Sequence, residues 1–162
     1  MPSLATIGVY GFTAETFIAA LADADAALLL DVRQRRGVRG PEYAWANARR
    51  LIALVADAGI AYRHVPELAP TTELRKLQYL EDDRAGVGKR SRTRLAESYR
   101  ERYLREILDR VDLEPIIDTL APAGASVLLC VERDPRACHR SLIAERIVAT
   151  RPGLPLRHIL PS

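Results

Sequence analysis

Cysteine, aromatic residues and long apolar runs are all scarce in this sequence. The 162 residues include two cysteines, aromatic residues make up 6% of the chain, and no apolar run approaches the roughly 20 residues of a membrane span. Two cysteines are too few for the disulfide framework of a small secreted protein. The N-terminus, MPSLATIGVYGF, lacks the basic and apolar segments of a signal peptide. We therefore expect a reduced, cytoplasmic protein with no membrane partner.

The remaining composition is that of an ordinary globular protein. Hydrophobic residues make up 48% of the chain and charged residues 28%, and the formal net charge is +3. A chain of this length can bury a real core as one unit. We expect a single domain over residues 1–162.

Short apolar runs alternate with segments of helical periodicity. The apolar runs predict strands over residues 4–10, 26–33, 59–66, 125–131 and 154–160, the last at an edge of the sheet. Helices are predicted over 14–22, 41–59 and 93–111, and over the segment that contains Ile143 and Ile147. Strands that alternate with helices favour a three-layer α/β domain, with a mostly parallel sheet of about five strands and helices on both faces.

Polar residues gather where the predicted strands end, and ligands of such sheets bind at the carboxyl ends of the strands. One reading is simply that strands must end in polar residues, and that an aspartate beside an arginine forms a structural ion pair. The other reading is a functional pocket, because several neighbouring strands share this feature. The residues concerned are Tyr10, Asp31, Arg33, His64, Glu67, Cys130 and Glu132.

The connection LLCVERDPRACHRSLIAERI carries both cysteines and one of the three histidines. Arg140 lies on the same helical stripe as Ile143 and Ile147, so it should point over the sheet edge from the start of the helix. The helix has two possible starts. Asp134 could cap it, or the segment DPRAC could be a loop with the helix beginning near His139, and only the second start turns Cys138 toward the crevice.

These residue types suit an enzyme that acts on a phosphorylated or nucleotide-like anion. Arg33 and Arg140 would hold the anion, Asp31, His64 or Glu132 would move protons, and Cys130 could be a nucleophile. Alternatively, the two arginines pair with Asp31 and Glu132 as structural ion pairs, and Cys130 is a small buried hydrophobe. The remaining candidate binding residues are Tyr10, Glu67, Cys138 and His139. The sequence specifies no cofactor and no oligomeric state.

Two further functions use other features. Cys130, Cys138 and His139, with His64 as an additional candidate, are zinc-type ligands. They lack the usual close ligand pairs, and adjacent Cys138 and His139 diverge if both are helical, so we expect no metal. The basic region 75–105 could bind nucleic acid. Its interleaved acids favour a solvated helix instead, and the chain has few aromatics and no known nucleic-acid-binding motif.

Four segments, taken in order, resemble the bacterial and archaeal family known as domain of unknown function 488. They are TIG, LLLDVR, GIAYRHVPEL and LLCVERDPRACHRSLIAERI, and the resemblance covers nearly the whole chain. It implies the fold and a site, with characteristic positions at Gly8, Asp31, Arg33, His64, Pro66, Leu68, Cys130, Glu132, Cys138, His139 and Arg140. The chain departs from the family pattern at Val9-Tyr10, at Ala69-Pro70 and in the serine-free loop QRRGVRGPEY.

Overall fold

Five parallel strands form the centre of the molecule. The computed structural model describes residues 1–162, with strands β1 (Pro2–Ile7), β2 (Ala26–Asp31), β3 (Ala61–His64), β4 (Gly124–Leu129) and β5 (Leu156–Ile159). Their order in the sheet is β3-β2-β4-β1-β5, and every neighbouring pair runs parallel. The predicted parallel sheet and its edge strand at residues 156–159 are confirmed.

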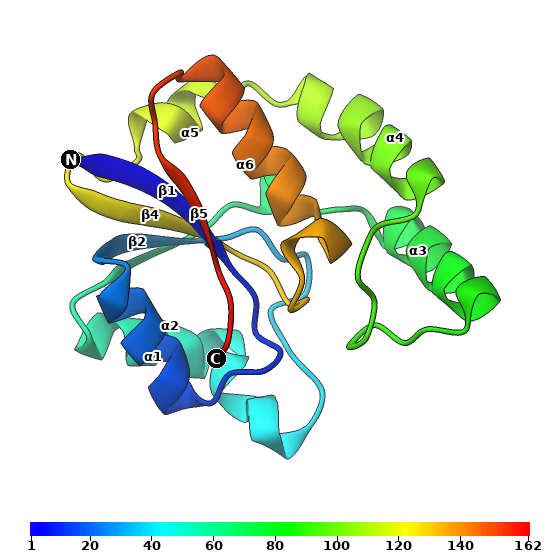
Figure 1. Cartoon of the computed structure of the whole chain (residues 1–162), viewed down its shortest axis with the longest axis horizontal. Helices are drawn as coiled ribbons and strands as arrows, with labels where there is room; N and C mark the ends of the chain where they lie inside the picture. Colours follow the sequence, from blue (N-terminus) through cyan, green and yellow to red (C-terminus); the bar gives the residue numbers. More distant parts are fainter.

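Helices cover both faces of this sheet, as the sequence predicts (Figure 1). Helices α1 (Ala14–Asp23) and α2 (Ala48–Asp57) pack on one face, and α5 (Glu114–Asp118) and α6 (His139–Thr150) pack on the other. Each face has its own apolar cluster, one around Phe17 and Leu51 and the other around Tyr103 and Ile143. None of the helices combines the length and the apolar character that crossing a membrane requires.

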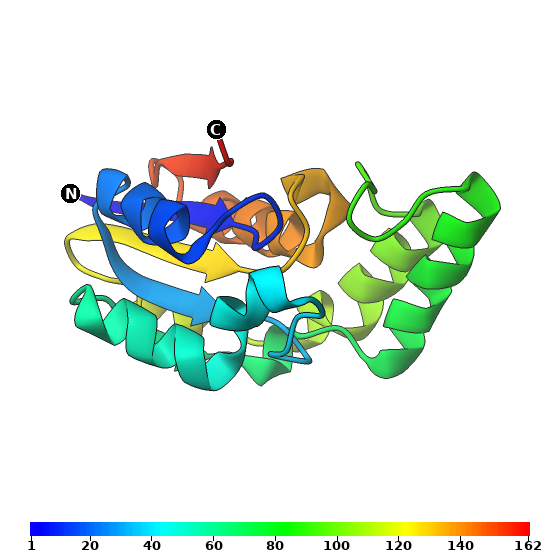
Figure 2. The ribbon, with the colours of Figure 1, turned by 90° about the horizontal axis from the view of Figure 1, so that it is seen from below.

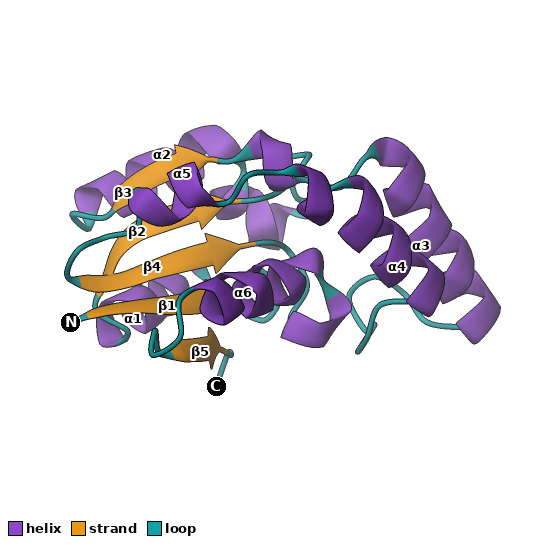
Figure 3. Cartoon of the chain, turned by 90° about the horizontal axis from the view of Figure 1, so that it is seen from above, coloured by secondary structure: helices purple, strands orange, loops and turns teal.

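Two further helices lie beyond the carboxyl ends of the strands. Figures 2 and 3 show α3 (Thr72–Ala85) and α4 (Glu97–Glu106) past the strand arrowheads, joined by a loop over residues 86–96. The rings of Tyr99 and Tyr103 on α4 are stacked and buried, and the Tyr103 hydroxyl donates to the Leu68 carbonyl at 2.7 Å. Both tyrosines therefore belong to the apolar cluster on the α5–α6 face of the sheet.

Two predicted helices are shorter than expected, and in both cases a side chain accepts a hydrogen bond from a backbone amide near the observed helix start. The segment 41–59 divides into a 3₁₀ helix (Pro41–Ala46) and α2, since Asn47 is extended and its Oδ1 accepts a hydrogen bond from Val38 N at 2.8 Å. The segment 93–111 becomes helical only at Glu97, and Ala96 N donates to Gln78 Oε1 at 2.9 Å. Both contacts hold loops at the carboxyl edge of the sheet.

Candidate functional site

Gly8 allows the segment after β4 to lie directly against the end of β1. A β-carbon on Gly8 would be 1.9 Å from the carbonyl oxygen of Glu132, so no larger residue fits there without displacing the backbone. The next two amides, of Val9 and Tyr10, both donate to the Val131 carbonyl, at 2.9 and 3.0 Å. These contacts fix residues 130–132 at the carboxyl edge of the sheet.

Each of the two expected helix starts corresponds to a real turn. The Asp134 carboxylate accepts from Arg136 N at 2.9 Å and so caps a short 3₁₀ helix (Pro135–Ala137). Cys138 is then extended, with φ −144° and ψ 150°, and α6 begins at His139. The segment DPRAC is therefore not part of α6, and Cys138 faces the crevice, as the second of the two expected helix starts requires.

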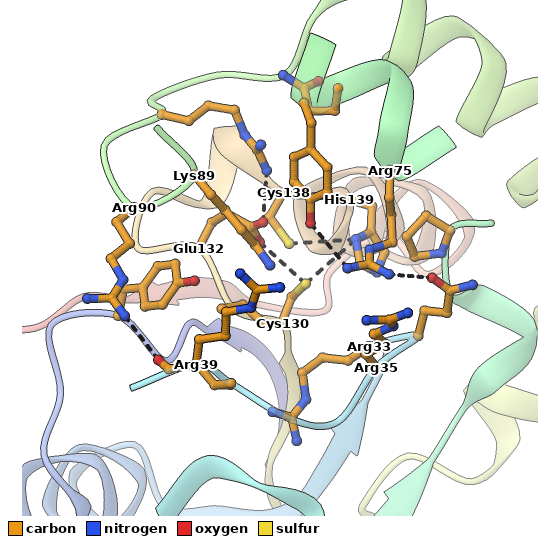
Figure 4. A pocket seen from close by; sticks show the side chains of 18 of the residues that line it. Arg33, Arg35, Arg39, Arg75, Lys89, Arg90, Cys130, Glu132, Cys138 and His139 are labelled. Carbon is orange, nitrogen blue, oxygen red and sulfur yellow. Dashed lines mark hydrogen bonds and ion pairs between the residues drawn. The ribbon is translucent and has the colours of Figure 1, made fainter. Parts of the chain in front are cut away.

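A cavity of about 1240 Å³ opens between this edge, the loop 33–39, helix α3 and the loop 86–96 (Figure 4). Tyr10, Cys130, Glu132, Cys138 and His139 all line it, as expected. The remaining wall is strongly cationic. Eight of its residues are basic and one, Glu132, is acidic; the basic ones are Arg33, Arg35, Arg36, Arg39, Arg75, Lys89, Arg90 and Arg92.

Most of these cations have no carboxylate partner. Only Arg33, Arg90 and Arg92 make ion pairs, which leaves five of the eight without one. Three of those five, Arg35, Arg39 and Lys89, have side chains that make no hydrogen bond or ion pair at all; two are exposed and Lys89 is half-buried. The cavity therefore carries an unbalanced positive charge.

Two sulfur atoms and an imidazole meet at the floor of the cavity (Figure 4). His139 Nδ1 is 3.7 Å from Cys130 Sγ and also 3.7 Å from Cys138 Sγ. On the other side of the ring, His139 Nε2 lies 2.8 Å from the carbonyl oxygen of Val32. All three side chains are buried and both cysteines are free thiols.

The pKa values of Cys130, Cys138 and His139 depend on one another. Burial opposes ionisation of Cys138, but the hydrogen bond from Cys130 and the charge of His139 lower the pKa of Cys138 well below its usual range. Burial and the adjacent Cys138 raise the pKa of Cys130. Burial opposes protonation of His139, but the charge of Cys138 and the hydrogen bonds to Cys138 and the Val32 carbonyl together raise the pKa of His139. The first ionisation of the pair is thus centred on Cys138 rather than Cys130.

Glu132 is buried but not isolated. Its Oε1 accepts from Arg92 at 2.8 Å, and the Cys130 thiol lies 3.5 Å from its Oε2. Burial and the negative charge of Cys138 raise the pKa of Glu132, whereas Arg92 and Lys89 oppose this rise. Arg92 also donates to Asp82 and to the Ala137 carbonyl, so one guanidinium joins α3, the end of β4 and the turn before α6.

Arg33 forms a structural ion pair at the wall. It donates twice to Asp31, at 2.9 and 2.8 Å, and once to the Ala46 carbonyl, and both ionised side chains are buried. The Asp31 carboxylate also accepts a hydrogen bond from the Tyr62 hydroxyl. Burial raises the pKa of Tyr62 to about 12. The hydrogen bond from Arg36 opposes this rise, and the hydrogen bond to Asp31 adds to it.

Three other predicted residues lie away from the cavity. His64 Nε2 is 3.0 Å from the Arg33 carbonyl oxygen, and Glu67 is exposed on the 3₁₀ helix Pro66–Leu68. Arg140 is fully buried, and its guanidinium donates to the carbonyls of Glu132 and Arg133 at 2.6 and 3.2 Å. Arg140 thus points over the sheet edge, as the helical stripe predicts, but its partners are backbone carbonyls, and Glu132 pairs with Arg92 instead.

The sequence reading missed the outer wall of the cavity. Arg75, Lys89, Arg90 and Arg92 belong to the basic region 75–105, for which interleaved acids favoured a solvated helix, and the structure turns these four toward the sheet edge. The loop QRRGVR contributes Arg35, Arg36 and Arg39. The sequence signal was the concentration of arginine in a loop that follows a buried strand.

Comparison with known proteins adds one result. A search of curated proteins and a search of solved structures each return no match. Residues 13–147 of the 162 match a family model described as "Domain of unknown function DUF488", in agreement with the resemblance seen in the sequence. The chain therefore belongs to the DUF488 family.

Proposed function

We propose that this protein is a small enzyme that binds a phosphorylated or nucleotide-like anion in the cationic cavity and acts on it beside the cysteine–histidine floor. One observation carries the proposal. The cavity wall has eight basic residues and one acidic residue, and the side chains of Arg35, Arg39 and Lys89 make no hydrogen bond or ion pair within the protein.

The charge distribution favours a multivalent anion. Like charges that converge on one cavity repel each other, and a bound phosphate would relieve that repulsion while accepting charge-assisted hydrogen bonds. Arg35 and Arg39 come from one loop and Lys89 from the loop opposite, so an anion between them would join the two walls. Arginine suits this role because its planar guanidinium offers paired donors to phosphate or carboxylate oxygens.

The size and apolar surfaces of the cavity favour a ligand larger than phosphate alone. Small-molecule sites commonly have volumes of about 300–1000 Å³, and this open cavity reaches about 1240 Å³. Tyr10, Tyr79 and Tyr99 are among the residues that line it. A sugar or base could pack on these rings while its phosphate contacts the cations.

The floor supplies groups that can take part in a reaction. Glu132 and His139 are buried groups that can exchange protons, and they lie beside the two thiols at the inner end of the cavity. A substrate held at the rim by its phosphate would extend its reacting group toward them. Two free thiols in this position also support a reducing, cytoplasmic setting as part of the proposal.

Thermal unfolding in the presence of anions tests the binding step. Pyrophosphate and AMP should raise the melting temperature of the wild type more than sodium chloride of equal ionic strength does, because a ligand of the folded state stabilises it by about 2.7 kcal/mol at 100 times its Kd. Arg39→Gln and Lys89→Gln should each reduce this shift. Arg50→Gln and Arg100→Gln remove exposed, unpaired arginines outside the cavity and should leave it unchanged.

The contrary outcomes are distinct. Equal shifts in all four variants, or no anion-specific shift in the wild type, would refute the cavity as the anion site. Tighter binding of a single-stranded oligonucleotide than of a mononucleotide would favour a nucleic-acid-binding module instead. Mass spectrometry of a mixture of mononucleotides and sugar phosphates incubated with the protein tests catalysis, and a mixture that binds but stays unchanged would contradict the enzymatic part.

A further inference from the structure

The floor of the cavity brings together three ligand atoms from two elements. Cys130 follows β4, Cys138 is the last residue before α6, and His139 is the first residue of that helix. Their Sγ, Sγ and Nδ1 atoms all lie within 4.8 Å of one another. Both sulfur–nitrogen distances are 3.7 Å.

We propose that Cys130, Cys138 and His139 bind a thiophilic divalent ion such as Zn²⁺, with a fourth coordination position open to the cavity. Tetrahedral zinc with bonds of about 2.3 Å to sulfur and 2.0–2.1 Å to nitrogen places sulfur and nitrogen ligands roughly 3.5–3.6 Å apart. The distances of 3.7 Å are close to this edge length, so an ion fits between the three atoms with small adjustments of the side chains.

The imidazole is already in the tautomer that a metal needs. His139 Nε2 lies 2.8 Å from the Val32 carbonyl oxygen, which can only accept a hydrogen bond, so Nε2 carries the proton. In the neutral imidazole Nδ1 therefore carries the lone pair, and it lies 3.7 Å from each sulfur, so an ion bound there would take the place of the Nδ1 proton of the imidazolium. Histidines that bind metals commonly donate their other ring N–H to a carbonyl or carboxylate in this way, which fixes the ring orientation.

The donor set and its surroundings suit a catalytic rather than a closed structural site. Two thiolates neutralise the charge of a divalent ion, so little net charge is buried. The same three residues line the cavity, so a fourth position is accessible to water or substrate. Glu132 lies alongside, with its Oε2 3.5 Å from Cys130 Sγ, and it is positioned to exchange a proton with a water at that fourth position.

The backbone before α6 removes the objection that the sequence raises. The sequence expectation of no metal rested on the absence of close ligand pairs and on the divergence of neighbouring residues in a helix. Cys138 is extended and His139 is helical, so these two adjacent side chains converge instead. The metal site depends on this geometry alone and not on the identity of the anion proposed above.

Titration of metal-free, fully reduced protein with Co²⁺ in phosphate-free buffer tests the proposal. One Co²⁺ per chain should produce thiolate-to-cobalt charge-transfer absorption together with the intense visible bands of tetrahedral cobalt, and Zn²⁺ should abolish both. Cys130→Ser and Cys138→Ser should each remove about half of the charge-transfer intensity, and His139→Gln should weaken Co²⁺ binding by about 10-fold or more. His158→Gln, which changes a histidine outside the cavity, is the control.

The wild-type spectrum alone can overturn the proposal, whether or not the cysteine variants fold. Absence of charge-transfer absorption in reduced wild type with excess Co²⁺ would mean that the thiols do not bind the ion. Charge-transfer absorption that persists undiminished in a folded Cys130→Ser or Cys138→Ser variant would equally refute the ligand set. Neither result bears on anion binding, so failure of this proposal is distinguishable from failure of the proposed function.

Discussion

At the scale of single residues, the two largest fully buried side chains are arginines with different acceptors. Arg33 is neutralised by the carboxylate of Asp31, whereas Arg140 donates to two backbone carbonyls. Arg140 Nε has no hydrogen-bond partner. The contacts of Arg140 hold the segment after β4 against Gly8, which indicates that it positions the cavity floor.

Replacement of Arg140 by alanine should therefore destabilise the protein and leave its response to anions intact. The buried Glu132 carbonyl would lose its donor, at a cost of about 1–3 kcal/mol, and the partly buried Arg133 carbonyl would lose one as well. Urea denaturation measures the loss, with Arg146→Ala on the same helix as control, since its partly exposed pair with Asp109 should be worth less than about 1 kcal/mol. An Arg140→Ala protein as stable as wild type, but without protection by pyrophosphate, would restore Arg140 as a ligand-binding residue.

Helical periodicity correctly predicted the direction of Arg140 but not its partners. The stripe shared with Ile143 and Ile147 points inward, and Arg140 is indeed buried. Its acceptors are backbone carbonyls, which every residue has, so no residue type in the sequence indicates them. A different limit applies to Glu132: its partner is a side chain, but Arg92 is 40 residues away in the sequence.

At the scale of elements, the loop 86–96 is attached to the sheet edge mainly through Arg92. Its guanidinium pairs with Asp82 at 2.7 Å and Glu132 at 2.8 Å and donates twice to the Ala137 carbonyl. All three charged side chains are buried. A second, backbone contact joins Leu95 N to the Arg136 carbonyl at 3.0 Å.

Arg92→Lys should loosen this loop although it conserves the charge. One ammonium cannot span two carboxylates and a carbonyl as the planar guanidinium does, and loss of one partner of a buried ion pair costs about 3–5 kcal/mol. Hydrogen–deuterium exchange should become faster for the amides of residues 88–96. Arg94→Lys alters an exposed side chain in the same loop and is the control; equal exchange in the two variants would contradict the role assigned to Arg92.

The elements that the sequence predicted well are those specified by apolar periodicity. The strands and α1 have regular patterns, and they were located to within a few residues. The helix over 41–59 was predicted too long because Asn47 interrupts it before α2, and the start of α6, which the sequence left open between two positions, lies directly after Cys138. The position of this start matters for function, because it turns Cys138 and His139 toward the same point.

At the scale of the whole molecule, the cavity exists because α3 and α4 lie beyond the strand ends rather than on a face of the sheet (Figure 3). The gathering of polar side chains at the strand ends could be predicted from the sequence, since parallel strands bring their carboxyl ends to one edge. The opposite wall could not, because it depends on how distant segments pack. Basic residues from 33–39 and 75–92 thus face Cys130 and His139 across one cavity.

If the cavity is an anion site, a bound anion should be found inside it, and crystallography can locate that anion. Crystals soaked in tungstate, a phosphate analogue with strong anomalous scattering, should show a peak between Arg39 and Lys89 that is absent from Lys89→Gln crystals. The peak should persist in Arg50→Gln crystals. Tungstate peaks found only outside the cavity, or a cavity peak unchanged by Lys89→Gln, would contradict the account.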